Sequence, residues 1–422
     1  MNITNSRISG LHKMSPVERL KKVVEVTGLG DDVISHLSNT GNLDAATADS
    51  MIENVIGTMN IPLGVATNML VDGQDVLVPM ATEESSVVAA VCNAARQCRS
   101  TGGFTTELSS AHMIAQVQLL GVSNPEFARL QILEHKPEIK AICDETDPVL
   151  LKHGGGFRDL EVRILKGRTG PMVITHLIID TQDAMGANAV NSMAEAVAPY
   201  IAKWTGGKTY LRILSNLADR RLARARATWS LEEIGGADVR DGILAAYDFA
   251  DVDPYRAATH NKGIMNGVSA VVLATGNDCR AVEAGAHAYA ARSGQYSSLT
   301  RWEADADGNL TGTIEMPLAV GLIGGATRSH PTARIVLDIM KITTAERLAC
   351  TIAAVGLAQN FAALKALATT GIQKGHMALH AKNIAVMAGA TGEEIEKVAN
   401  ELVTHGRVRV DVAEEILRGI RK

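Results

Sequence analysis

The chain has 422 residues, enough for two or three domains around a large core, and its 46% apolar content and net charge of −5 are typical of a globular protein. That charge gives no indication of general nucleic-acid affinity. The five cysteines show no paired spacing and the N-terminus lacks the regions of a signal peptide, so we expect reduced thiols, a cytoplasmic location and no membrane association.

The first informative segment is an apolar, nearly uncharged stretch, 53–81, that leads into Glu83 and Glu84. Apolar residues at helical spacing follow, so we expect an amphipathic helix that begins at these carboxylates, with Thr82 as its N-cap. An apolar loop leaves a carboxylate little water, which suits a proton donor near neutral pH. The alternative is that acidic residues simply favour a first helical turn.

The stretch from 109 to 215 reads as strand, helix, strand, strand, helix, strand. This order predicts a ferredoxin-like unit, in which an antiparallel four-stranded sheet carries two helices on one face. The strands are expected at 113–120, 160–166, 172–180 and 208–215, and the helices at 124–141 and 188–204.

We therefore predict an α+β fold with an inserted ferredoxin-like domain. The proposed domains are a large mixed domain in two parts, the small inserted domain and a C-terminal helical flap: 1–108 with 216–374, 109–215, and 375–422. Three short helices are expected in the flap, at 377–390, 392–403 and 410–421, behind a hinge at Gly371 and Gly375. No GxGxxG string occurs, so a Rossmann nucleotide site is not expected.

Three groups of polar residues could carry chemistry. Lys262 lies in a polar stretch, 256–263, that reads as a loop before a buried run, and could be an oxyanion stabiliser, a Schiff-base nucleophile or a surface charge. Asp278 follows an expected strand end and could be an ordinary helix N-cap. His376 and His380 are four residues apart on an expected helix, but nothing nearby completes a metal site, so no metal is expected.

Four sequence segments resemble 3-hydroxy-3-methylglutaryl-CoA (HMG-CoA) reductase, and they occur in the order of that family. They are ENVIG at 53–57 with VPMATEE at 78–84, DAMGAN at 183–188, THNKG at 259–263 and GHM at 375–377. No stretch before residue 50 is long and apolar enough to span a bilayer, so the chain resembles class II, the soluble bacterial and archaeal branch.

The resemblance implies that HMG-CoA and two reduced nicotinamides are interconverted with mevalonate and CoA. It assigns Lys262 to the developing oxyanion, Glu84 to proton supply, Asp278 to a bond network joining them, and His376 to protonation of the CoA thiolate. Of the two glutamates, Glu84 aligns with the catalytic residue of the family and Glu83 is the second choice. Ser85 departs from the family pattern, since a proline is expected at that position. The substrate-binding positions implied are Ser86, Arg256, Asn266, Asn216, Gln359 and Asn360.

The resemblance also places the nicotinamide cofactor on the small domain, at Asp183, Met185, Gly186 and Asn188. Asp147 matches a position associated with NAD-using relatives, and Asp144 and Glu145 add negative charge. We therefore expect NAD(H) to be preferred, with NADP(H) possible. The family's shared sites imply a homodimer, or a higher assembly of dimers.

Two other classes of function remain open at the level of sequence. A lyase could use Lys262 as a Schiff base without any nicotinamide. A non-catalytic protein could bind CoA phosphates or RNA through the basic segment 219–226, although no aromatic residues interleave and a solvated helix face is the plainest interpretation.

Overall fold

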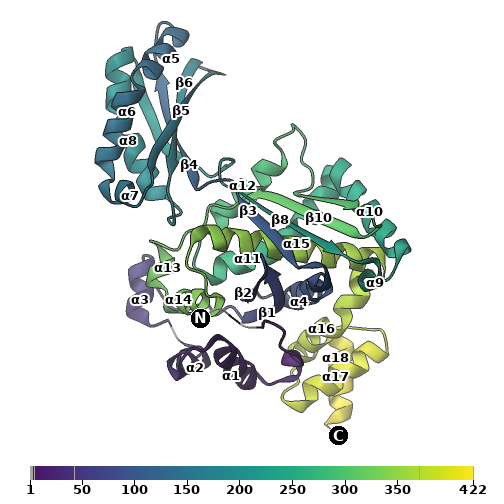
Figure 1. Ribbon diagram of the computed structural model, residues 1–422. Helices are drawn as coiled ribbons and strands as arrows, with labels where there is room; N and C mark the ends of the chain where they lie inside the picture. The colour runs from purple at the N-terminus through teal and green to yellow at the C-terminus, as the bar shows by residue number, and fades with distance from the viewer. Residues whose placement is uncertain (1–2, 4, 42, 370, 422) are drawn as a thin grey trace.

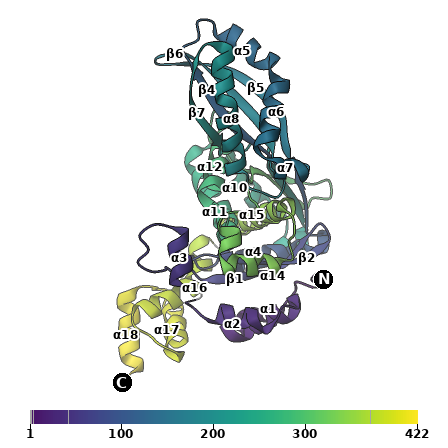
Figure 2. The same cartoon turned by 90° about the vertical axis from the view of Figure 1, so that its left-hand side faces the viewer.

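The computed structural model describes residues 3, 5–41, 43–369 and 371–421; the side chains at 328 and 372–379 fall outside the described set. The fold is a mixture of helices and sheets, which confirms the predicted α+β class. Figures 1 and 2 show a four-stranded sheet with its helices at one end of the molecule, a larger sheet in the middle and three C-terminal helices at the opposite end.

The larger sheet has six strands in the order β2-β1-β3-β8-β10-β9, and all neighbours are antiparallel except β1 and β3. Its strands are β1 (Leu63–Val71), β2 (Gln74–Ala81), β3 (Phe104–Leu108), β8 (Leu222–Trp229), β9 (Thr300–Ala304) and β10 (Leu310–Pro317). Small residues at alternate positions of β8, Ala223, Ala225 and Ala227, face the core and let helices pack closely.

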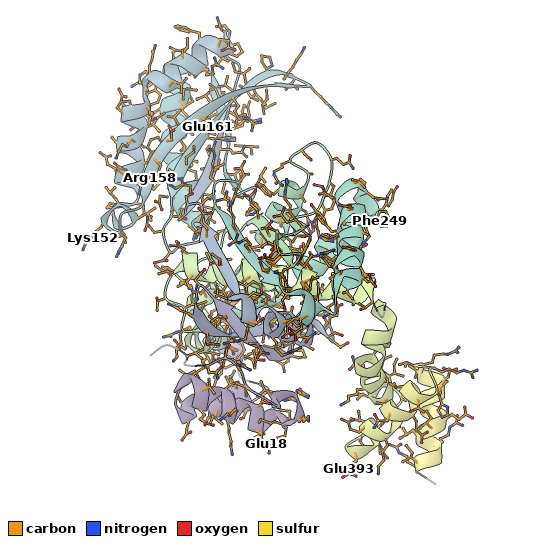
Figure 3. All side chains as sticks on the ribbon, turned by 45° about the vertical axis from the view of Figure 1, so that its right-hand side comes forward. Glu18, Lys152, Arg158, Glu161, Phe249 and Glu393 are labelled. Carbon is orange, nitrogen blue, oxygen red and sulfur yellow. The ribbon has the colours of Figure 1, made fainter. Side chains whose placement is uncertain are left out.

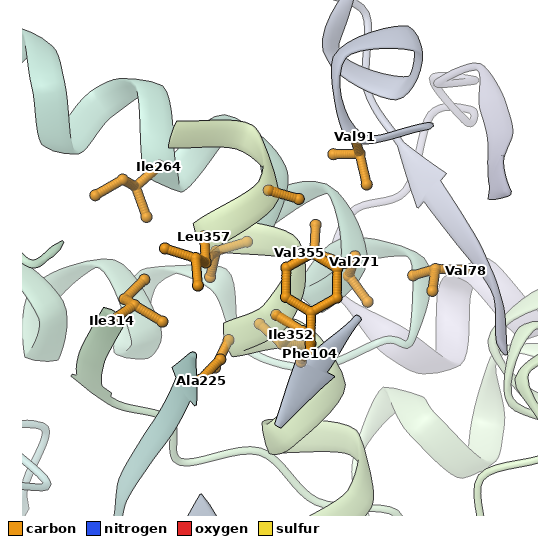
Figure 4. Close-up of a cluster of buried hydrophobic side chains, with 14 of the residues drawn as sticks. Val78, Val91, Phe104, Ala225, Ile264, Val271, Ile314, Ile352, Val355 and Leu357 are labelled. Atoms are coloured by element: carbon orange, nitrogen blue, oxygen red, sulfur yellow. The ribbon is translucent and has the colours of Figure 1, made fainter. Parts of the chain in front are cut away.

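Helices from both halves of the chain cover this sheet. They are α4 (Val87–Gln97), α9 (Leu231–Ile234), α10 (Ala237–Val252), α11 (Pro254–Ala274), α12 (Cys279–Ala290), α13 (Ala326–Ser329), α14 (Pro331–Met340) and α15 (Ala345–Ala368), with a 3-10 turn η2 (Arg99–Thr101) after α4. Figure 4 shows Val78, Phe104, Ile264 and Ile352 meeting in the aliphatic core between the sheet, α11 and α15.

Helix α15 is central to this core. Within the described chain it is the one helix long and apolar enough to cross a membrane, and 83% of its most apolar window is buried inside the protein. Such burial is what a core helix of this length requires.

The N-terminal segment packs beside β1 and β2. It contains η1 (Leu11–Lys13), α1 (Pro16–Thr27), α2 (Asp31–Ser38) and α3 (Ala45–Met51). Helix α1 begins with a capping box between Ser15 and Glu18 and ends at Gly28, whose φ of 65° suits a glycine C-cap.

The four-stranded sheet has the order β5-β6-β4-β7, with every neighbour antiparallel, which is the ferredoxin-like arrangement expected from the sequence. Its elements are β4 (His112–Leu120), α5 (Pro125–Glu134), α6 (Lys136–Thr146), α7 (Pro148–Lys152), β5 (Gly156–Gly167), β6 (Gly170–Asp180), α8 (Ala187–Thr205) and β7 (Lys208–Ser215). The single helix predicted at 124–141 is in fact two helices, because the chain turns at His135 and Pro137 starts the next.

The C-terminal unit has the three helices expected: α16 (Ile372–Met387), α17 (Glu393–Thr404) and α18 (Val410–Ile420). Its apolar residues form a cluster of their own, which includes Ile384, Val398 and Leu417. Gly371 has a φ of 75° before α16, whereas Gly375 lies inside that helix. The domain bounds given above stay predictions.

Two local predictions are wrong. The segment 256–263 is not a loop before a buried strand but the first half of α11, whose N-cap Asp253 accepts two backbone N–H bonds, so Asp278 follows a helix rather than a strand. The basic segment 219–226 is not a helix face either, because it enters β8, where arginine and alanine alternate with the period of two of a strand.

Candidate active site

Three of the predicted site residues meet beside the middle of helix α11. The Nζ of Lys262 lies 2.8 Å from Oε2 of Glu84, and the Nδ2 of Asn266 donates to Oε1 of the same carboxylate at 3.3 Å. Lys262 and Asn266 are one turn apart on α11, so both face the loop that carries Glu84. The arrangement engages both carboxylate oxygens.

The loop before α4 presents Glu84. The backbone N–H of Glu84 donates to Oγ1 of Thr82 at 3.2 Å, and Ser86 has a φ of 77° at the N-cap position. Helix α4 therefore begins at Val87, and the expectation that it begins at the two glutamates is wrong. The left-handed turn at Ser86 leaves Glu84 on a loop in front of the helix.

This ion pair is accessible to solvent in the single chain. The Lys262 side chain is 61% exposed and that of Glu84 is 40% exposed, so the expected water-poor carboxylate is not found here. Exposed ion pairs contribute only about 0–1 kcal/mol. The fold therefore does not depend on the pair for its stability.

Asp278 is the N-cap of α12. Its Oδ1 accepts the backbone N–H groups of Arg280 at 2.9 Å and Ala281 at 3.1 Å. No hydrogen bond or ion pair links it to Lys262 or Glu84 among the described residues. Asp278 is therefore the helix cap that the alternative describes, and the three-residue network is not formed in the single chain. The catalytic role of Asp278 stays a prediction.

The other predicted substrate residues are spread around α11 and α15. Arg256 is half-buried in the first turn of α11, and burial lowers the pKa of its guanidinium. Asn360 is buried in α15, where its Oδ1 accepts bonds from Thr300 and Trp302 at 2.9 Å each. The Oε1 of Gln359 is buried without a hydrogen-bond partner.

Two further predicted residues lie apart from these. Ser86 holds the turn described above. Asn216 is exposed in the crossover after β7, where its carbonyl accepts the N–H of Ala218 at 2.9 Å. The structure does not bring Asn216 to Glu84 or Lys262.

All of the predicted cofactor residues except Asp183 line a large cavity of about 2290 Å³ between the N-terminal segment, the large sheet and the small domain. Met185, Gly186 and Asn188 enter it at the start of α8, and Asp147 and Asp278 also line it. Figure 3 shows Lys152 and Arg158 at the end of the small domain that faces the large sheet.

The turn before α8 is shaped by Gly186. Its φ is 97°, and a Cβ there would lie 2.4 Å from Cγ2 of Thr181, so only glycine fits. The Oδ1 of Asp183 accepts the N–H of Ala345 at 2.7 Å at the start of α15. That bond therefore holds the turn against the start of α15.

Asp147 is the N-cap of α7. Its Oδ1 accepts the N–H of Leu150 at 2.9 Å, and Oδ2 has no hydrogen-bond partner within the described residues. Asp144 pairs with Lys140, and its Oδ1 is buried without a partner. Negative charge thus gathers where α6 meets α7.

Both histidines singled out in the sequence lie on α16. His376 lies outside the residues whose side chains are described, and His380 is exposed. Over the described side chains, no group of three or more His, Cys, Asp or Glu residues is arranged to hold a metal ion.

Sequence reasoning missed Arg221, whose side chain is fully buried at the junction of the two sheets. A signal was present. Residues 221 to 229 alternate with period two, and Arg221 is in phase with Ala223 and Ala225, which face the core.

Comparisons with known proteins agree with this architecture. Residues 15–381 match the family model described as hydroxymethylglutaryl-coenzyme A reductase. The chain is 56% identical over 417 residues to 3-hydroxy-3-methylglutaryl-coenzyme A reductase of Archaeoglobus fulgidus, covering 99% of this chain and 95% of that protein. It is 35% identical over 383 residues to a probable reductase of Borreliella burgdorferi, covering 88% and 87% of the two chains.

A solved structure gives the same result. The class II 3-hydroxy-3-methylglutaryl-CoA reductase of Streptococcus pneumoniae, bound to NADPH in open conformations, is 38% identical and superposes with a TM-score of 0.82, over 97% of this chain and 100% of that one. The chain therefore belongs to the class II hydroxymethylglutaryl-coenzyme A reductases, a family of oxidoreductases.

Proposed function

We propose that Glu84, Lys262 and Asn266 form the catalytic cluster with which this reductase interconverts HMG-CoA and mevalonate plus CoA. The observation that supports this assignment is the bonding of both Glu84 oxygens, one by Lys262 and one by Asn266. An ion pair this exposed adds little stability. It joins residues of two matched motifs, and Asn266 bonds to it from a further position that the resemblance assigns to substrate binding, which favours a chemical role.

Lys262 would stabilise the negative charge that develops on the thioester oxygen. An ammonium fixed by a carboxylate needs little reorganisation as that charge forms. Glu84, bonded to the same ammonium, is placed to supply, through Lys262, the proton that converts the alkoxide left by the second hydride transfer into the alcohol. Arg256, half-buried and without an ion-pair partner among the described residues, suits the free carboxylate of the HMG group.

The turn before α8 suits a nicotinamide dinucleotide. Gly186 lets the backbone come close to a ligand, and Met185, Gly186 and Asn188 line the large cavity at the N-terminus of a 19-residue helix. The bound nicotinamide would supply the hydride equivalents. Asp183 would hold the turn through the start of α15.

We infer a preference for NAD(H) over NADP(H). The free Oδ2 of Asp147 can accept a ribose hydroxyl, and the neighbouring Asp144 and Glu145 would repel a 2′-phosphate.

We also propose a homodimer with shared active sites, because the exposed Lys262–Glu84 pair would need a partner subunit to exclude water from the reaction.

Glu84→Gln, Lys262→Ala and Asp278→Asn test the cluster. We expect the first two to lower kcat for HMG-CoA roughly 100- to 1000-fold, as for loss of an oxyanion donor, with unchanged melting temperatures. Asp278→Asn tests whether substrate or a partner subunit brings Asp278 into the network. Near-normal kcat in Lys262→Ala would remove the proposal, and borohydride trapping of substrate on Lys262 would favour the lyase instead.

His376 is proposed to protonate the CoA thiolate that leaves after the first reduction. Mevaldehyde is the aldehyde that remains for the second reduction, so an assay with free mevaldehyde separates the role of His376 from those of the other residues. His376→Gln should lose HMG-CoA reduction but keep much of its mevaldehyde reduction, since no thiolate leaves in that step. The matched control is His380→Gln, four residues further on. Equal loss on both substrates would show that His376 has another role.

A further inference from the structure

We propose that Arg221 is a positioning residue that holds the cofactor turn, residues 181–186, against the large domain. Its side chain is fully buried and lies where three chain segments cross: the turn 181–184, the crossover after β7, and the segment 318–323 after β10. The inference rests on the proposed function, because it takes that turn to be the cofactor site.

Neutral oxygens surround the Arg221 guanidinium. Its Nη1 donates to Oγ1 of Thr181 and to the carbonyl of Ala184, each at 3.0 Å, and its Nη2 donates to the carbonyl of Val320 at 2.7 Å and that of Gln182 at 3.4 Å. No carboxylate lies within ion-pair distance in the described part of the chain. A buried cation without a paired anion is costly unless its donors are satisfied. Here both Nη groups bond to these oxygens, whereas the Nε is buried without a partner among the described residues.

The charge is nevertheless retained. Burial lowers the pKa of Arg221 to about 10, with Asp180 and Asp183 opposing the shift, so the side chain stays protonated at neutral pH. Charged hydrogen bonds are roughly twice as strong as neutral ones. The guanidinium therefore ties two segments together more firmly than an apolar side chain of its size could.

The same two segments meet at several other points. The N–H of Leu322 donates to the carbonyl of Asp183 at 2.8 Å, and Ala184 pairs with Ile323 as an isolated β-bridge. A Cβ at Gly321 would lie 2.3 Å from the backbone nitrogen of Met185, so the contact leaves no spare room. These contacts hold the turn 181–186 against the segment 320–323, and we call this set of contacts the clamp. Arg221 supplies the buried charge at its centre.

The clamp also extends to the residue before Asp278, which the resemblance places in the catalytic network. The N–H of Gly321 donates to Oδ1 of Asn277 at 2.8 Å, and Asn277 directly precedes Asp278. Met185 and Asp278 line the same cavity. A shift of the turn would therefore change the placement of a bound nicotinamide, and a misplacement of about 1 Å can cost about 100-fold in rate.

Arg221→Met, Arg221→Lys and the matched control Arg220→Met test this role. Arg220 is the exposed neighbour, paired with Glu161 on the surface. In Arg221→Met we expect the KM for the nicotinamide cofactor to rise roughly 10- to 100-fold, as for loss of charged buried hydrogen bonds. The KM for HMG-CoA should stay within about twofold. Arg221→Lys should recover part of the effect, and Arg220→Met should have none.

Hydrogen–deuterium exchange provides a readout that does not depend on activity. Arg221→Met should speed exchange in 181–188 while the C-terminal helices keep their protection. Unchanged cofactor KM and unchanged exchange would overturn the proposal, as would an equal rise of both KM values with faster exchange throughout the chain.

If Arg221→Met does not fold, Thr181→Val tests the proposal in its place. This variant removes one acceptor of Arg221 and should raise the KM for the cofactor but not the KM for HMG-CoA. If the wild type turns over with neither NADH nor NADPH, the proposed function fails, whereas the exchange result still tests the clamp.

Discussion

At the scale of single residues, the site depends on polar groups that are only partly buried. Lys262 and Glu84 belong to segments 178 positions apart, yet their charged atoms meet at 2.8 Å. Asn266 completes the arrangement from the next turn of α11. Because none of these groups supports the core, each can be replaced without unfolding the protein, and kinetics can report on their chemistry.

The cofactor preference should depend on Asp147. We expect the wild type to use NADH with a higher kcat/KM than NADPH, and Asp147→Ala to narrow that preference roughly tenfold, because a repelling carboxylate is lost. Asp147→Asn is the matched control for the cap on α7, since asparagine also serves as an N-cap. A wild-type enzyme already faster with NADPH would contradict the assignment.

At the scale of elements, α11 carries both the site and a buried histidine behind it. His260 contacts Ser298 at 2.8 Å, Thr300 at 3.0 Å and Asn360 at 3.2 Å, and its Nδ1 is buried without a partner. Burial lowers the pKa of His260 to about 3, with the charge of Arg256 adding to the effect. The imidazole of His260 therefore stays neutral in the folded protein.

This histidine predicts an acid-dependent loss of stability. Between the unfolded pKa near 6.5 and the folded value of about 3, the unfolded chain binds one more proton, so the free energy of unfolding falls as pH falls. From pH 7 to pH 5 the loss should be about 2 kcal/mol. His260→Asn should flatten this slope in urea unfolding, whereas exposed His405→Asn should not. An unchanged slope in His260→Asn would show that other groups cause it.

The C-terminal helices form a separate element with its own apolar cluster. We predict that a chain ending at Lys374 still dimerises and binds NAD, yet hardly turns over HMG-CoA, because it lacks His376 and the unit proposed to close over the site. Sedimentation, cofactor titration and the reductase assay check this. Near-normal activity would exclude both the closing unit and the histidine, and loss of NAD binding would show that the unit supports the cofactor site.

At the scale of the whole molecule, apolar surface lies before β1. Ile52 is 65% exposed, Ile56 is fully exposed and Met59 is 88% exposed. Exposed apolar groups clustered in this way mark interaction surfaces. The stretch leads to Pro62, whose carbonyl accepts the N–H of Thr82 at 3.1 Å, so a second subunit seated there would lie near the loop that carries Glu84.

We therefore expect a dimer whose stability depends on this segment. The double variant Ile56→Asp with Met59→Asp should sediment as a monomer at concentrations where the wild type is a dimer, and should lose activity with it, since burying two charges at an interface is unfavourable. Phe127→Asp, on the exposed side of α5, is the matched apolar-to-acid control. A variant that remains dimeric would place the interface elsewhere.

Local patterns in the sequence were enough to predict much of this protein. The strands and helices of the ferredoxin-like unit follow from period-two and period-3.6 spacing with glycine punctuation, and the motifs around Glu84, Asp183 and Lys262 were enough to indicate the family. Where such patterns compete, the prediction was wrong: the polar first half of α11 resembles a loop, and the arginines of β8 resemble a solvated helix face.

The tertiary structure decided which polar residues meet. Lys262 pairs with Glu84 because α11 packs beside β2, and Arg221 is buried because β8 enters the sheet where the turn at 181–184 crosses it. Asp278 became a helix cap for the same reason, since its place depends on where α11 ends. Contacts between distant segments depend on packing, and no local periodicity specifies them. The sequence by itself therefore determined the elements and the motifs, and the tertiary structure decided the ion pair, the clamp and the cavity.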